Sequence, residues 1–228
     1  MDFERVMVFG AHPDDEVTMS GTIAKMADRG VRVVVVNMTN GSEGYPRLDM
    51  RDKIVEMRAQ EAAECDQVLG IARRVILDVE DMGLVNDKAT VQECIRLIRE
   101  EKPEAVFTHG PVDRHRDHRN THAISVDARW HAGEPVAAAL GEPWYPRHMY
   151  YYKGVVEGLP QIHYDVTGYA HKRYEAQATQ VSQHTLWGRT GDEFLAGAER
   201  VKNEGGPATE VFWIAETERL HDFIPKDL

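Results

Sequence analysis

The feature that constrains the fold most is a pair of continuous apolar runs close to the start of the chain. Residues 6–9 (VMVF) end at Gly10, and the β-branched run 31–36 follows a helix-like segment, 20–29, that stops at Gly30. Strands that are apolar at nearly every position are typical of a parallel sheet covered on both faces. With a helix between them, these two runs predict a βαβ unit of about 30 residues.

The same alternation of strand-like and helix-like segments continues along the chain. Further strands are expected at 75–79, 105–108, 149–152, 163–166 and 212–215, with helices at 49–69, 90–101, 113–131, 170–183 and 191–202. Helices that alternate with strands pack on the faces of a parallel sheet through right-handed connections. We therefore expect an α/β three-layer sandwich with a mostly parallel central sheet, built as a single domain over residues 1–228.

The overall charge and the cysteine content restrict the classes of partner and compartment. The formal net charge of -11 argues against binding to nucleic acid or to an anionic membrane, because an acidic surface repels phosphate. The two cysteines, Cys65 and Cys94, are too few for a disulfide framework and leave room for one bridge at most. No stretch has the pattern of a signal peptide or a membrane span, so we expect a cytoplasmic protein with no membrane partner.

Two dense clusters of histidines and acids each follow an expected strand. The first, residues 10–16 (GAHPDDE), comes after strand 6–9, and the second, residues 113–118 (DRHRDH), comes after strand 105–108. Ligands of parallel sheets bind beyond the carboxyl ends of the strands, so the two clusters should meet at one edge of the sheet.

The clusters together contain a complete set of metal ligands. His12 and Asp15 from the first cluster, with His118 from the second, can offer two imidazole nitrogens and one carboxylate to one ion. With water in the fourth position, this is the open donor set of a catalytic zinc. We expect one Zn²⁺ per chain, and Fe²⁺ or another divalent metal could take the same place.

Asp14 and His115 are the candidates for proton transfer. The side chain of Asp14 diverges from that of its neighbour, so it is free to act as a general base toward a metal-bound water. His115 lies one helical turn before His118 and next to Asp113 and Asp117; when protonated, it would stabilise an oxyanion or protonate a leaving amine. These residue types fit hydrolysis of an acyl bond by metal-activated water.

At these motifs the chain resembles the LmbE-like, or PIG-L, family of zinc-dependent N-acetylglucosaminyl deacetylases, which includes deacetylases of the mycothiol and bacillithiol pathways. The resemblance covers most of the chain and rests on residues 11–16 (AHPDDE), 21–24 (GTIA), 58–62 (RAQEA) with 69–70 (LG), and 111–118 (PVDRHRDH). It implies a Rossmann-like fold, an N-acetylated amino sugar or its conjugate as substrate, and assembly into homo-oligomers.

The resemblance also implies roles for individual residues. Zinc would be held by His12, Asp15 and His118, as the donor types also indicate. Asp14 would be the base, His115 supported by Asp117 the acid or oxyanion stabiliser, and Arg58 part of the sugar pocket.

Three positions depart from the family pattern. Arg116 stands where proline is usual, which leaves the ligands in place but alters the start of the helix. Asp113 stands where some relatives carry a tyrosine that polarises the carbonyl, so we expect Asp113 to contact the substrate region in an unassigned role. Gln180 replaces a histidine often found two residues before the Ser182-Gln183 pair, which points to a different substrate pocket.

Several residues have a plain structural interpretation beside the functional one. Arg58 could pair with Glu61 or Glu64 along its helix. His109 and His122 could line the site or be ordinary core or surface residues. The loops 40–51 and 133–147 are the expected carriers of substrate specificity.

Three functions are compatible with these observations. The first is a zinc-dependent deacetylase of an N-acetylated amino sugar or its conjugate. The second is an amidase or esterase that acts on another small acyl conjugate, in thiol or natural-product metabolism. The third is a metal-binding module without turnover, which is disfavoured because a mere binding site needs neither a base such as Asp14 nor an acid such as His115.

Overall fold

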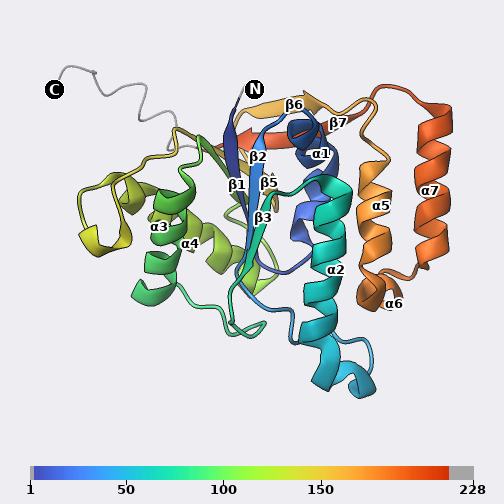
Figure 1. Cartoon of the computed structure of the whole chain (residues 1–228), viewed down its shortest axis with the longest axis horizontal. Helices are drawn as coiled ribbons and strands as arrows, with labels where there is room; N and C mark the ends of the chain where they lie inside the picture. Colours follow the sequence, from blue (N-terminus) through green and yellow to red (C-terminus); the bar gives the residue numbers. More distant parts are fainter. Residues whose placement is uncertain (1–2, 216–228) are drawn as a thin grey trace.

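The computed structural model describes residues 3–215, which contain one mixed sheet of seven strands (Figure 1). The order of the strands across the sheet is β3-β2-β1-β4-β5-β7-β6. The pairings between β3, β2, β1, β4 and β5 are parallel, and β7 is antiparallel to both β5 and β6. The strand bounds are Arg5–Gly10 (β1), Arg32–Asn37 (β2), Arg73–Ile76 (β3), Ala105–His109 (β4), His148–Lys153 (β5), Gln161–Asp165 (β6) and Thr209–Ile214 (β7).

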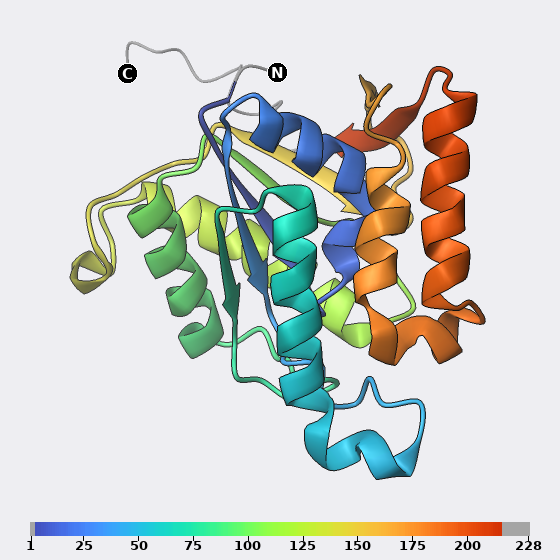
Figure 2. The ribbon, with the colours of Figure 1, turned by 45° about the vertical axis from the view of Figure 1, so that its right-hand side comes forward.

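Helices cover both faces of the sheet, which confirms the expected three-layer α/β sandwich. In Figures 1 and 2, α3 and α4 lie on one face and α1, α2 and α5 on the other, with α7 outside α5. The helices are Ser20–Asp28 (α1), Ile54–Leu69 (α2), Lys88–Glu101 (α3), Arg116–Gly133 (α4), Lys172–Thr179 (α5), His184–Trp187 (α6) and Gly191–Glu204 (α7). Short 3₁₀ helices are Asp15–Met19 (η1), Leu48–Lys53 (η2), Ala138–Leu140 (η3) and Val181–Gln183 (η4). Within residues 3–215, none of the helices combines the length and the apolar character needed to cross a membrane.

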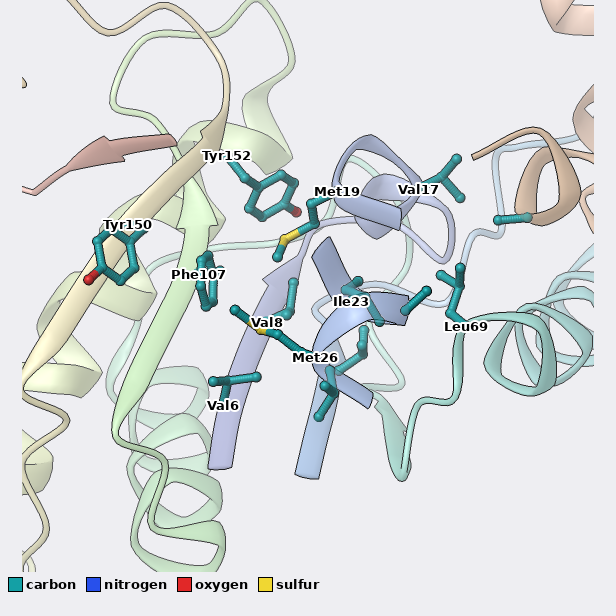
Figure 3. Close-up of a cluster of buried hydrophobic side chains, with 14 of the residues drawn as sticks. Val6, Val8, Val17, Met19, Ile23, Met26, Leu69, Phe107, Tyr150 and Tyr152 are labelled. Carbon is teal, nitrogen blue, oxygen red and sulfur yellow. The ribbon is translucent and has the colours of Figure 1, made fainter. Parts of the chain in front are cut away.

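The central strand β1 is apolar from Val6 to Phe9 because these residues contribute side chains to two hydrophobic cores. Val6 and Val8 point into the core beneath α1, α2 and α5, where Figure 3 shows them among side chains such as Ile23 and Phe107. Met7 and Phe9 point into the opposite core, beneath α3 and α4. Burying each such side chain contributes about 1.5–3 kcal/mol, so the strand that carries the site is held from both sides.

The two cysteines lie on opposite faces of the sheet. Cys65 belongs to the core that contains Val8, whereas Cys94 belongs to the core that contains Met7. Both are free and buried, so no bridge joins them.

The register of the parallel strands brings the two clusters to one edge. Gly10 at the end of β1 is level with Asn37 at the end of β2, and β4 runs beside β1 in the same direction. His109, at the end of β4, pairs with Lys153 of β5 after a register irregularity. The segments that follow β1 and β4 therefore leave the sheet at neighbouring points, as expected for a site at the carboxyl edge.

Several expected elements differ in their bounds. The helix expected at 49–69 begins with the 3₁₀ segment Leu48–Lys53, and the strand expected at 75–79 is found at Arg73–Ile76. The helix expected at 170–183 ends at Thr179, and Val181–Gln183 is a separate turn. That turn is held in place by a long-range contact, because Glu61 of α2 accepts hydrogen bonds from the backbone N–H and the hydroxyl of Ser182.

Candidate active site

The turn after β1 is organised around the carboxylate of Asp15. Its Oδ2 atom accepts hydrogen bonds from the backbone N–H groups of Ala11 (2.8 Å) and His12 (2.9 Å). The backbone N–H of Asp14 donates to the carbonyl of His12 at 2.8 Å, which closes the turn. Asp15 is therefore both buried and fixed, while its Oδ1 atom faces the second cluster.

The second cluster opens helix α4 and places His118 against Asp15. His118 Nε2 lies 3.5 Å from Asp15 Oδ1, and His12 Nδ1 lies 3.7 Å from Asp15 Oδ2. The ring centroids of His12 and His118 are 5.3 Å apart. The structure thus brings together the three residues that the sequence suggested as metal ligands.

Two sets of side chains in this cluster have the geometry to hold a metal ion. One set is His12, His115 and His118, and the other is Asp15, His109 and His118; in each, one ligand atom per residue lies within 4.8 Å of the others. Imidazole nitrogens and carboxylate oxygens are donors that suit zinc and several other divalent metals. The arrangement can therefore hold a metal, with His118 common to both sets.

Two of the histidines each have a ring nitrogen close to a carboxylate of the second cluster. His12 Nε2 lies 3.4 Å from Asp117 Oδ2, and His118 Nδ1 lies 3.0 Å from Asp113 Oδ2. Carboxylates in such positions orient metal-binding imidazoles. Burial acts to lower the pKa of His12, but Asp117 and Asp15 overcome it and raise that pKa to about 10. The carboxylates of Asp117 and Asp15 therefore favour positive charge at His12.

His115 caps helix α4 and faces the cavity. Its Nδ1 atom accepts a hydrogen bond from the backbone N–H of Asp117 at 3.2 Å, so a neutral ring carries its proton on Nε2. The Asp117 carboxylate itself is farther away, 3.8 Å from Nδ1, and lies closer to His12. Burial, followed by the charge of His12, lowers the pKa of His115. The contact between residues 115 and 117 is thus mainly through the main chain.

Arg58 forms its ion pair with Asp14, which lies outside its own helix. Arg58 Nη2 is 3.2 Å from Asp14 Oδ2, and the Arg58 side chain is 2% exposed. A Cβ atom at Gly41 would come within 2.7 Å of Arg58 Nε, and Gly41 has φ of +77°, so this position requires glycine. Glu61, the suggested helical partner, accepts from Ser182 instead.

These residues surround a cavity of about 420 Å³. Its walls are formed by His12, Asp14, Asp15, Glu43, Gly44, Arg58, Asp81, Met82, His115, His118, Lys153 and Gln183. Asp113 and Asp117 are not among these lining residues, which favours an orienting role for both. Gln180 is not among these lining residues either; it is buried and donates a hydrogen bond to the hydroxyl of Thr179.

Of the two loops expected to carry specificity, only the first contributes to the described walls of this cavity. Glu43 and Gly44 come from loop 40–51, and Gln183 donates to the carbonyl of Gly44 at 2.8 Å. Loop 133–147 lies elsewhere, because the buried guanidinium of Arg99 on α3 binds its backbone carbonyls, including those of Ala137 and Gly141. The expectation for the second loop is therefore wrong for this cavity.

Two further residues contact Asp15 but lie outside the sequence motifs. Lys153 Nζ lies 2.5 Å from Asp15 Oδ1, and His109 Nε2 lies 3.1 Å from Asp15 Oδ2. Burial acts to lower the pKa of Lys153, but Asp15 raises it; conversely, burial acts to raise the pKa of Asp15, but Lys153 and His109 hold it well below its usual range. Both residues end adjacent parallel strands, and this position was the feature from which their place at the site could have been predicted.

The fold and the site define a three-layer α/β protein with a His/Asp cluster able to hold a metal at the carboxyl edge of its sheet. Residues 7–129, more than half of the 228-residue chain, match the PIG-L family, described as GlcNAc-PI de-N-acetylase. The chain belongs to this family.

Individual relatives cover the chain in part. The 1D-myo-inositol 2-acetamido-2-deoxy-alpha-D-glucopyranoside deacetylase of Thermomonospora curvata is 34% identical over 176 residues, which are 64% of this chain and 59% of the relative. The diacetylchitobiose deacetylase of Thermococcus kodakarensis is 30% identical over 139 residues, 59% of this chain and 52% of the relative. The matched region thus spans between half and three fifths of these curated relatives.

Structural similarity extends over nearly the whole chain. The N,N'-diacetylchitobiose deacetylase from Pyrococcus horikoshii, solved with an inhibitor, has a TM-score of 0.80 at 24% identity and covers 99% of this chain and 88% of its own. This likeness shows that the two chains share a fold.

Proposed function

We propose that this chain is a metal-dependent deacetylase that hydrolyses the acetamide group of an N-acetylated amino sugar or its conjugate to acetate and a free amine. The observation that carries the proposal is the convergence of Asp14, His115 and a metal-competent His/Asp cluster on one cavity. Membership of the PIG-L family supports the reaction, and two relatives named as deacetylases of acetamido sugars support the substrate class.

The residues proposed to hold the metal are His12, Asp15 and His118. They supply two nitrogens and one carboxylate, the donor set that leaves a position open for water. Zinc is the proposed ion, with Fe²⁺ as the alternative. When bound, it would lower the pKa of its water toward about 7 and polarise the acetyl carbonyl.

Asp14 is proposed as the general base. It lines the cavity next to the proposed ligands, and its carboxylate is held by Arg58 at 3.2 Å. The arginine fixes the direction of the carboxylate, which a base needs before it can accept a proton from the attacking water. That proton balances the one that the departing nitrogen gains, so the reaction consumes one water and releases acetate and the amine.

His115 is proposed to stabilise the oxyanion and to assist the leaving amine. Its Nδ1 atom is occupied by the backbone N–H of Asp117, which leaves the Nε2–H free to donate. Donors that are fixed before the reaction stabilise developing negative charge without reorganisation. Asp117 contributes by fixing the ring and by contacting His12.

A pair of substitutions tests this assignment. Asp14→Ala should retain one equivalent of metal and lose most amine release, because only the base is removed. His118→Ala should lose both. Metal content by plasma mass spectrometry and amine release from N-acetylglucosamine conjugates measure the two effects. Full activity of Asp14→Ala would contradict the mechanism, and unchanged metal content of His118→Ala would contradict the ligand set.

A further inference from the structure

A buried ionic network lies directly behind the turn that carries His12 and Asp15. At its centre is Arg74 of β3, whose side chain is 6% exposed. Its guanidinium donates to Glu16 Oε1 at 2.8 Å, to Asn37 Oδ1 at 2.6 Å and to Asp66 Oδ1 at 2.5 Å. One side chain thus joins β3 to β2, to α2 and to the end of the metal-site turn.

The network contacts the metal-site turn at both of its ends, at His12 and at Glu16. Asn37 links Arg74 to the start of the turn, because its Nδ2 atom donates to the backbone carbonyl of His12 at 2.8 Å. Glu16, which is fully buried, immediately follows Asp15. Arg74 therefore fixes the main chain at His12 through one bridge and the chain after Asp15 directly. It is not among the described residues that line the cavity, so any effect on the site passes through these contacts.

Stability alone is a poor explanation for this arrangement. The carboxyl groups of Glu16 and Asp66 share one buried guanidinium, and Glu16 Oε2 has no hydrogen-bond partner among residues 3–215. Apolar groups of similar volume are often as stabilising as a buried ion pair, because desolvation offsets the Coulombic gain. A planar fork with several fixed donors does, however, define distances between the groups it joins.

We propose that Arg74 is a positioning residue that sets the spacing of His12 and Asp15 by holding both ends of the turn between them. This inference rests on the proposed function, in which these two side chains bind the metal. Groups behind a metal ligand typically change metal affinity by about 10- to 100-fold when they are removed. The network would thus act on the affinity of the site and on its geometry.

Two variants and a matched control test the role of Arg74. Arg74→Lys keeps the charge but not the planar fork, and the triple variant Arg74→Met/Glu16→Gln/Asp66→Asn removes the charges together, so that no carboxylate is stranded. Arg73→Lys is the control, because Arg73 is the preceding residue of the same strand and pairs with Glu100 and Glu101 away from the cavity. The Zn²⁺ affinity of each protein is measured by competition with a fluorescent chelator, beside its thermal unfolding.

We expect each Arg74 variant that unfolds cooperatively to bind Zn²⁺ about 10- to 100-fold more weakly than wild type, with Arg73→Lys unchanged. The proposal is overturned when either Arg74 variant unfolds cooperatively and binds Zn²⁺ as tightly as wild type. If the triple variant does not fold, Arg74→Lys still provides the test. A wild-type chain that binds no Zn²⁺ would instead contradict the proposed function on which the inference rests.

Discussion

Arg58 on α2 and Asp14 in the turn after β1 lie 3.2 Å apart, with the arginine 2% and the aspartate 17% exposed. The carboxylate proposed as the base is thus held from behind by a buried cation, while its other side faces the cavity. The base and two of the proposed metal ligands, His12 and Asp15, come from one turn, but the arginine that holds the base comes from a helix about 40 residues later, where it is the first residue of the motif 58–62.

This contact predicts that Arg58→Met lowers kcat by about 100-fold, because a misplaced base costs roughly that factor. Metal content should stay at the wild-type level, since Arg58 is not a proposed ligand. Amine release under saturating substrate and metal analysis measure the two quantities. Arg51→Met, an exposed arginine in the preceding 3₁₀ segment, is the control and should behave as wild type. Unchanged kcat in Arg58→Met would show that Asp14 needs no such support.

His115 has two roles that can be separated by substitution. His115→Asn keeps a side chain that can cap α4, so we expect normal thermal stability but about 100- to 1,000-fold slower amine release, the cost of losing one oxyanion donor. His115→Ala also loses the cap that accepts from Asp117 N and should be less stable by about 1 kcal/mol. Equal activity of His115→Asn and wild type would exclude the oxyanion role.

Asp113 is expected to act through His118 rather than on the substrate. Its Oδ2 atom lies 3.0 Å from His118 Nδ1, and its Oδ1 atom accepts from the backbone N–H of His115 at 2.8 Å. Asp113→Asn should weaken metal binding by about tenfold with little change in KM once the site is saturated with metal. Asp127→Asn, an exposed acid of α4, serves as the control. A large rise in KM with unchanged metal affinity would instead support direct contact with substrate.

Glu210 gives a prediction for stability against pH. It accepts from the backbone N–H groups of Gly21 (2.9 Å) and Thr22 (2.8 Å) at the start of α1, yet burial raises its pKa above the usual value. Because the folded state then holds this proton longer than the unfolded state, the free energy of unfolding falls as pH rises through the folded pKa. Relative to Glu210→Gln, wild type should therefore lose stability as the pH rises above about 4, the ordinary pKa range of a glutamate.

Urea unfolding of both proteins at several pH values measures this difference. The Glu210→Gln variant removes the titration but keeps one acceptor for the helix, so the comparison isolates the ionisation. A stability difference that rises with pH would mean that the carboxylate form of Glu210 is the favoured one.

The fold could be predicted from the sequence because its strongest signals are local. The apolar run at residues 6–9 requires cover on both faces, and the alternation of strands and helices then leaves few topologies. The convergence of His12, Asp15 and His118 followed from the same argument, since both clusters come after parallel strands.

The parts that escaped prediction depend on contacts between distant residues. Nothing around Lys153 distinguishes it from other lysines until β5 places it against Asp15. Helix α5 ends at Thr179, and the turn that follows it is fixed by Ser182, which donates to Glu61, 121 residues away along the chain. Loop 133–147 was expected to carry substrate specificity, but its backbone carbonyls bind Arg99 of α3. Composition does not reveal such pairings.

The most direct test of the account is the release of free amine from N,N'-diacetylchitobiose and other N-acetylglucosamine conjugates by chelator-stripped protein, titrated with Zn²⁺. The account predicts no activity in the stripped protein and activity that rises to a plateau at one equivalent of metal per chain. Amine release that is independent of added metal, or its absence from every conjugate at full metal occupancy, would contradict it.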